Sequence, residues 1–146
     1  DKSSAKLFVD YAKDPFVNEV NRYATGGYVD LQHNKLSSTV ELEWQYIQRE
    51  TSVSNQFSNY YLAYTLSKAS KYSISAVTEL TFDPVQIFDS KPYNLYPALI
   101  TTYQPGNKTK LTLFCGKRRG GPACNSRVCY DVLDFKGLEL RLNTRF

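Results

Sequence analysis

The sequence predicts an all-β chain, folded as an antiparallel transmembrane β-barrel with about eight strands in residues 1–146. Three observations lead to this fold class. Apolar and polar side chains alternate with a period of two, short and long connections alternate along the chain, and aromatic residues stand near the ends of the predicted strands. A chain of 146 residues fits a single barrel domain.

The composition favours strands over helices. With 42% hydrophobic and 22% charged residues, the chain is too apolar to be disordered. The 12 tyrosines and the scattering of single large apolar residues among polar ones suit a sheet. The longest apolar run, residues 60–64, is far shorter than the roughly 20 residues that a membrane-spanning helix needs.

The first half of the chain contains the clearest strand. Residues 5–11 and 22–32 alternate weakly, whereas residues 39–46 alternate strictly. In that third segment Val40, Leu42 and Trp44 share one face and Glu41 and Glu43 share the other. Such strict alternation predicts a strand with one apolar and one polar face.

The second half repeats the pattern. Residues 60–67 and 72–82 alternate clearly, residues 96–103 and 108–118 more weakly, and residues 135–146 alternate up to the terminal Phe146. The connections between all these segments fall into two classes. Residues 33–35, 68–71 and 104–107 are short, and residues 14–21, 50–55, 83–94 and 120–134 are long. Outer-membrane barrels keep short turns on the periplasmic side and long loops outside, which predicts the orientation of this chain.

The polar faces carry charges of both signs. If the barrel is correct, its interior receives Glu41, Glu43, Glu79, Lys110, Glu139 and Arg141, which can form pairs between neighbouring strands. Closure of the last strand on the first is expected to bring Arg141 near Lys6 or Asp10.

The basic cluster Lys117, Arg118 and Arg119 is expected at the outer end of the seventh strand. There it would contact phosphates of the outer-leaflet lipid, because clustered guanidinium groups suit phosphate oxygens. A solvated basic loop is an equal alternative. Nucleic acid is a poorer partner, because the chain has neither a helical motif nor an aromatic platform with interleaved basic residues.

The remaining reactive residues favour no chemistry. Cys124 and Cys129 predict a loop disulfide rather than a metal site, because no further ligand is spaced to complete a tetrahedron, and Cys115 falls on an apolar face. His33, the sole histidine, lies in a predicted short turn on the periplasmic side, away from the outer rim where barrel enzymes work. We therefore predict no catalytic residue, no metal and no cofactor.

Two resemblances concern the end of the chain. Gly137, Leu138, Leu140, Leu142 and Phe146 resemble the C-terminal signal of bacterial outer-membrane proteins, which implies the barrel-assembly machinery as a partner. The stretch that contains Arg119, Gly120, Gly121, Cys124, Cys129, Phe135, Lys136 and Gly137 is similar to the tail of an uncharacterised family of Bacteroidota outer-membrane barrels.

The family resemblance covers roughly the last 40 residues. Members of that family are longer, which implies that residues 1–146 are the C-terminal segment of a larger barrel, whereas eight strands permit a complete small one.

These observations predict a non-enzymatic protein of the bacterial outer membrane. It would act as a porin-like pore, a surface binder or a subunit of an envelope complex. Its expected partners are outer-membrane lipid and lipopolysaccharide, the assembly machinery and other envelope proteins. Two alternatives stay open: a secreted, soluble β-sandwich that binds a partner through its long loops, and an outer-membrane barrel enzyme.

Overall fold

The computed structural model describes residues 2–14, 20–49, 56–69, 71–84, 92–106, 108–125, 128–132 and 134–144. The all-β prediction is confirmed, because these residues form ten strands and no helix. None of the described residues therefore belongs to a helix long and apolar enough to cross a membrane.

Eight of the strands form one sheet. They are β1 (Lys2–Asp14), β2 (Val20–His33), β3 (Leu36–Gln48), β4 (Gln56–Lys68), β5 (Tyr72–Thr81), β6 (Asn94–Tyr103), β7 (Thr109–Arg118) and β10 (Phe135–Thr144). Each strand pairs antiparallel with the next, in the order β1-β2-β3-β4-β5-β6-β7-β10. All eight coincide with segments that the alternation predicted, although β1 to β4 are longer at both ends than expected.

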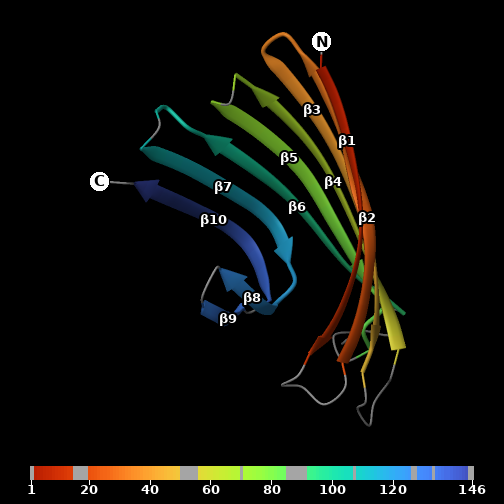
Figure 1. Ribbon diagram of the computed structural model, residues 1–146. Helices are drawn as coiled ribbons and strands as arrows, with labels where there is room; N and C mark the ends of the chain where they lie inside the picture. The colour runs from red at the N-terminus through yellow and green to blue at the C-terminus, as the bar shows by residue number, and fades with distance from the viewer. Residues whose placement is uncertain are drawn as a thin grey trace.

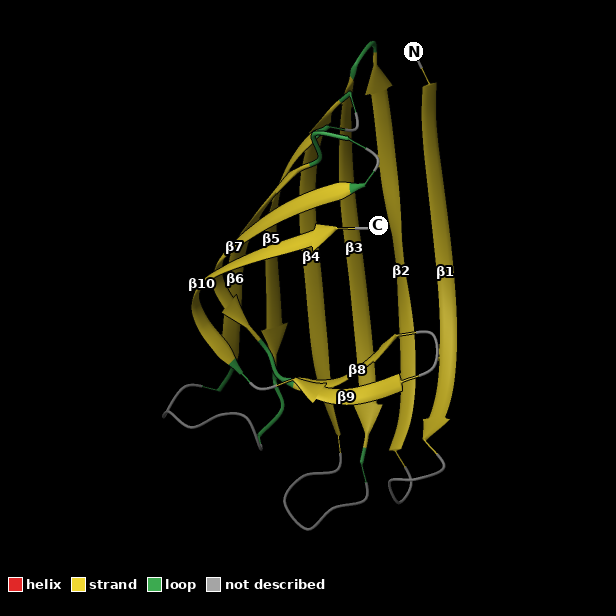
Figure 2. Cartoon of the chain, turned by 90° about the vertical axis from the view of Figure 1, so that its left-hand side faces the viewer, coloured by secondary structure: helices red, strands yellow, loops and turns green. Residues whose placement is uncertain are grey.

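A separate hairpin lies within the last long connection. It consists of β8 (Gly121–Asn125) and β9 (Val128–Val132), which pair only with each other. It was not predicted, because its short segments carry Gly, Pro and Asn signals rather than sustained alternation. Figures 1 and 2 show it at the end of β7, on the concave side of the large sheet.

The sheet is curved but not closed into a barrel. Its edges are β1 and β10, and the two are not paired with each other within the described residues. Figure 1 shows both edges of the curved sheet standing apart. The expected approach of Arg141 to Lys6 or Asp10 across a closing seam is therefore not present; Arg141 instead contacts Glu139 of its own strand. Closure depends on accumulated twist and curvature, which the period-two pattern does not encode.

The predicted sorting of connections is reproduced in part. The turns between β2 and β3, β4 and β5, and β6 and β7 span two, three and five residues and lie at one end of the sheet, with both termini (Figures 1 and 2). We call this the short-turn end. The other connections lead to the opposite end, which we call the long-loop end. Those after β3 and β5 span seven and twelve residues, whereas the one after β1 spans five, no more than the β6–β7 turn.

The register gives the sheet two chemically different faces. Because paired residues point to the same side, one row across six strands contains Leu7, Gly27, Leu42, Leu62, Thr78 and Pro97. The next row contains Phe8, Gly26, Glu43, Tyr61, Glu79 and Tyr96. We name the first side the apolar face and the second the polar face.

The buried residues lie on the polar face and at its long-loop end. They are Ala24, Phe57, Ala63, Tyr96 and Phe114, together with the polar Asn59, Thr81 and Asp83. The large apolar side chains of the other face are exposed, with Leu7 at 88% and Leu138 at 68%. This distribution reverses the arrangement of a water-soluble sheet, in which the apolar face packs inward.

A glycine allows the close approach of β6 and β7. Gly116 has φ of 146°, and a Cβ atom built on it would lie 2.4 Å from the Pro97 carbonyl oxygen and 2.5 Å from the Ala98 Cα. Only glycine avoids this contact, because every other residue carries a Cβ.

Candidate functional site

The six predicted interior charges share the polar face. Glu43 and Glu79 lie on either side of Tyr61 in one cross-strand row. Glu41 is two residues from Glu43 on β3 and therefore lies on the same face. On the C-terminal strands, Lys110 lies opposite Asn143, and Arg141 lies opposite Thr112. A closed interior around these residues is still a prediction.

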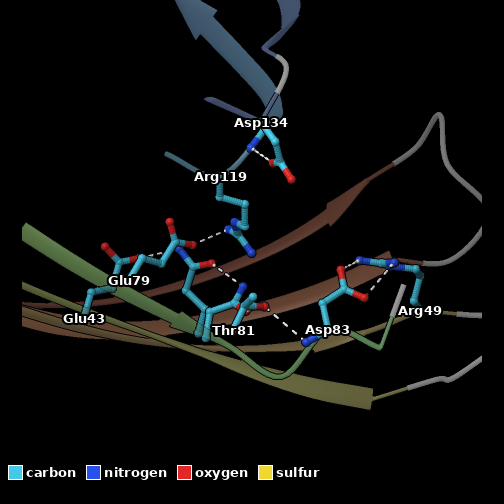
Figure 3. A network of polar contacts seen from close by, with 10 residues as sticks. Glu43, Arg49, Glu79, Thr81, Asp83, Arg119 and Asp134 are labelled. Carbon is cyan, nitrogen blue, oxygen red and sulfur yellow. Dashed lines mark hydrogen bonds and ion pairs between the residues drawn. The ribbon is translucent and has the colours of Figure 1, made fainter. Parts of the chain in front are cut away.

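Three of the carboxylates line a small polar cavity of about 270 Å³. Glu41, Glu43 and Glu79 border it, and the other lining residues are Gln45, Asn59, Tyr60, Tyr61 and Arg119. The Arg119 Nη2 atom lies 2.8 Å from the Glu79 Oε1 atom. Arg119 follows β7 and Glu79 belongs to β5, so this ion pair spans β6, which lies between them in the sheet. Figure 3 shows the contact between the two side chains.

A chain of hydrogen bonds leads from this cavity toward the long-loop end. Gln45 donates to the Glu43 carboxylate at 2.7 Å, and the Asn59 amide donates to Gln45 at 3.5 Å. The Thr81 hydroxyl then donates to Asn59 at 2.6 Å, and the Asp83 backbone N–H donates to Thr81 at 3.1 Å (Figure 3). Because Asn59 and Thr81 are buried, this network supplies the partners that polar groups need away from water.

The network ends at a buried ion pair between two long connections. Arg49 follows β3, and its guanidinium reaches both carboxylate oxygens of Asp83 at 2.8 and 3.5 Å. Asp83 is only 2% exposed, and the Arg49 guanidinium also lies over the Phe57 ring at 4.7 Å. The fork of contacts joins the segments that leave β3 and β5.

A second charged group lies where β7 meets β10. Glu139 pairs with Arg118 at 3.2 Å and with Arg141 of its own strand. The Arg118 guanidinium lies within 6 Å of the centres of the Phe114 and Phe135 rings, which is cation–π distance. The side chain therefore combines an ion pair with two aromatic contacts.

The structure separates the predicted basic cluster. Arg118 and Arg119 form ion pairs with Glu139 and Glu79 on the polar side, whereas Lys117 stands on the apolar face opposite Lys136. Period-two alternation could have revealed this split, because adjacent residues of a strand point to opposite faces. Contact of this cluster with lipid phosphate is still a prediction, and Lys117 is the member placed on the apolar face.

A hydrogen bond also joins the two ends of the connection between β7 and β10. The Gly120 backbone N–H donates to the Asp134 carboxylate, at the point where the chain leaves β7 and returns to β10 (Figure 3). Asp134 and the pair Arg119 and Glu79 were not predicted as a group, because they come from β5 and from both sides of the hairpin.

The cysteines are placed in part. Cys124 of β8 pairs directly with Cys129 of β9 in the backbone register, but their side chains lie outside the described residues. Cys115 is a free, exposed cysteine on the apolar face, opposite Leu138. The loop disulfide is therefore still a prediction.

The predicted assembly strand corresponds to β10. Leu138, Leu140 and Leu142 lie opposite Cys115, Leu113 and Leu111 on the apolar face, and each is more than 60% exposed. Gly137 pairs with Gly116, and Phe146 lies outside the described residues. His33 was expected in a short turn; it is instead the last residue of β2, directly before that turn at the short-turn end.

Aromatic rings gather at the two ends of the apolar face. At the long-loop end, Tyr11, Tyr23 and Tyr46 form a ladder with ring centres 5.0 and 6.3 Å apart, and a second group joins Tyr60 to Phe82 at 6.2 Å. At the short-turn end, the rings of Tyr72 and Tyr103 stack at 4.7 Å. Mainly aliphatic side chains lie between these two bands.

Comparison of the chain with models of protein families, with curated proteins and with solved structures gave no significant match.

Proposed function

We propose that this chain is a non-enzymatic protein of the bacterial outer membrane, whose apolar face contacts lipid and whose polar face lines a barrel interior. The observation that carries the proposal is the exposed apolar face. Its large side chains extend from Leu7 on β1 to Leu142 on β10, so both edges of the sheet and all strands between them contribute. Contiguous apolar surface of this extent marks an interaction with lipid or with another apolar surface.

The aromatic bands support a membrane rather than a protein partner. From Tyr72 to Phe82 the chain rises by about 33 Å along the strand, and a tilt of ~40° reduces this rise to about 25 Å across the sheet. That distance matches the height of the apolar band of outer-membrane barrels, with Tyr and Trp at both interfaces. Long connections at one end only are a further feature of that class.

Lipid contact also requires that the sheet edges be paired. Unpaired N–H and C=O groups cost several kcal/mol each in hydrocarbon, so an open edge is not stable there. We therefore propose that β1 and β10 are paired in the membrane, with each other in a small barrel or with further strands of a larger one. The second arrangement agrees with the resemblance to longer Bacteroidota barrels.

The proposed partners follow from this arrangement. Outer-membrane lipid and lipopolysaccharide would contact the apolar face, and the barrel-assembly machinery would recognise β10. The same sheet is compatible with three roles: a pore, a surface binder, or a subunit that assembles with other envelope proteins. A soluble sandwich would need a second sheet over the apolar face, whereas the described hairpin β8–β9 lies on the concave side.

Trp44 provides a direct test, because it is the single tryptophan and stands on the apolar face at 40% exposure. In vesicles of lipids with brominated acyl chains, its fluorescence should be quenched. The control variant, Trp44→Phe with Tyr61→Trp, carries the indole on the polar face and should be quenched much less. Equal quenching of both proteins, or a chain that stays monodisperse without detergent, would rule out the membrane proposal.

A further inference from the structure

A second cavity lies on the polar face at the short-turn end, far along the strands from the acidic cavity. It encloses about 690 Å³ and is bordered by the β2–β3 and β4–β5 turns and by residues of β6 and β7. This volume is in the range of pockets that bind small organic molecules. We call it the basic groove.

Its lining consists mainly of hydrogen-bond donors. Lys35, Lys71 and Lys110 supply three ammonium groups from two turns and from β7. Ser67, Ser73 and Thr102 add hydroxyls from three adjacent strands, and the amides of Gln32 and Gln104 also line the groove. No Asp or Glu side chain is among the lining residues that the structure describes.

The carboxylate of Asp30, which contacts two lining residues of the groove, already accepts several hydrogen bonds. Asp30 accepts hydrogen bonds from Ser37 at 2.6 Å, from Thr39 at 2.9 Å and from Gln32 at 3.1 Å. Over the described residues, no ion pair joins Lys35, Lys71 or Lys110 to an acidic side chain. Three ammonium groups that border one groove repel one another, so an anion bound in the groove is stabilised.

The two ends of the polar face therefore differ in charge. Glu41, Glu43 and Glu79 meet a single described cation, Arg119, at the acidic cavity. The basic groove has three cations without a lining carboxylate. The net positive charge of the chain alone does not explain why acidic side chains gather at one end of the polar face and lysines at the other.

From this geometry we propose that the basic groove binds a phosphate ester of about the size of a sugar phosphate. Lys71 and Lys110 approach the phosphate as point charges, and Lys35 adds its charge from the β2–β3 turn. The hydroxyls of Ser67, Ser73 and Thr102 and the amides of Gln32 and Gln104 bind the hydroxyl groups of the ester. This inference does not rest on the membrane proposal, because the groove is present in the open sheet.

The test is calorimetric titration of the detergent-solubilised full chain with glucose 6-phosphate. Glucose and inorganic phosphate serve as the two halves of that ligand, and short-chain phosphatidic acid in the micelle serves as the lipid source of the same chemistry. We expect a phosphate ester to bind more tightly than glucose or phosphate. Lys71→Gln and Lys110→Gln should each weaken binding of the ester about tenfold. If glucose 6-phosphate binds more tightly than phosphatidic acid, the ligand is a soluble phosphate ester; the reverse order indicates a lipid headgroup.

Lys68→Gln is a close control, because Lys68 belongs to the same strand end and pairs with two lining residues, Leu36 and Tyr72, but lies on the apolar face and does not itself line the groove. It should leave the affinity unchanged. An equal loss in Lys68→Gln would show unspecific attraction and overturn the proposal, as would the absence of binding by both esters. All three lysines are exposed, so circular dichroism should show the same sheet in every variant.

Discussion

At the scale of single residues, the tightest constraint on the sheet is the space beside Gly116. Its backbone lies so close to β6 that no side chain fits, and Gly137 of β10 stands opposite it with φ of 157°. The small side chain of Ala98 continues this row onto β6. The absence of a side chain at Gly116 therefore allows β6 and β7 to approach closely.

Gly116→Ala should destabilise the folded chain by about 2 kcal/mol, because its Cβ would meet the Pro97 carbonyl oxygen and because φ of 146° disfavours any side chain. The measurement is urea unfolding in detergent. Gly106→Ala is the control, since a Cβ there meets nothing within 4 Å. Equal stability of the two variants would contradict the close approach.

The ion pair of Arg49 and Asp83 gives a second expectation at this scale. Asp83→Asn should cost about 3 kcal/mol, because a nearly buried carboxylate loses its charge and leaves the guanidinium poorly paired. Asp10→Asn is the comparison, since Asp10 and Arg22 are both about half exposed and 3.6 Å apart. That variant should lose less than ~1 kcal/mol. If Asp83→Asn also lost less than ~1 kcal/mol of stability, the buried ion pair would contribute little to the folded state.

At the scale of elements, local patterning predicted the eight strands of the sheet but not their full length or the hairpin. β3 begins at Leu36, three residues before the predicted start, because its hydroxyl-bearing Ser37, Ser38 and Thr39 continue the register without a clear apolar alternation. The ion pair of Arg119 with Glu79 could not be predicted, since it joins the residue after β7 to β5 across the intervening β6. Such contacts depend on sheet curvature rather than on local sequence.

The hairpin β8–β9 offers a test at the scale of elements. Directly paired residues of antiparallel strands have Cα atoms about 4.5 to 5.5 Å apart, which suits the ~4.4 to 6.8 Å of disulfides. We expect Cys124 and Cys129, paired in the register, to form a disulfide in protein purified under oxidising conditions. Peptide mapping by mass spectrometry without reductant should find this link and a free Cys115. A Cys115 linked to either of the other two would contradict the register.

At the scale of the whole molecule, the open edges are the main difference between the structure and a finished barrel. β1 and β10 run in opposite directions along the sheet, so they have the orientation required for antiparallel pairing with each other or with added strands (Figure 2). The sequence could not predict this feature, because alternation describes the two faces of a strand and not its neighbours. Each edge strand presents one side to the apolar face and the other to the polar face, as the remaining strands of the sheet do.

Hydrogen exchange in lipid should detect the pairing of these edges. If they are paired, the backbone amides of β1 that point away from β2 should exchange as slowly as those of the central β4. Light scattering in detergent then separates a barrel closed within one chain from one completed by a second copy. Fast exchange of these β1 amides in vesicles would contradict barrel closure.

The unbroken register also limits how this chain can vary through evolution. Since the register keeps the apolar face and the polar face on opposite sides from strand to strand, removal of one residue inside β4 would exchange the two faces over the rest of that strand. Changes in strand length should therefore come in pairs, and single insertions should fall in the long connections. An alignment of related chains that shows odd-length gaps within β3, β4 or β5 would mean that the faces of the sheet are interchangeable after all.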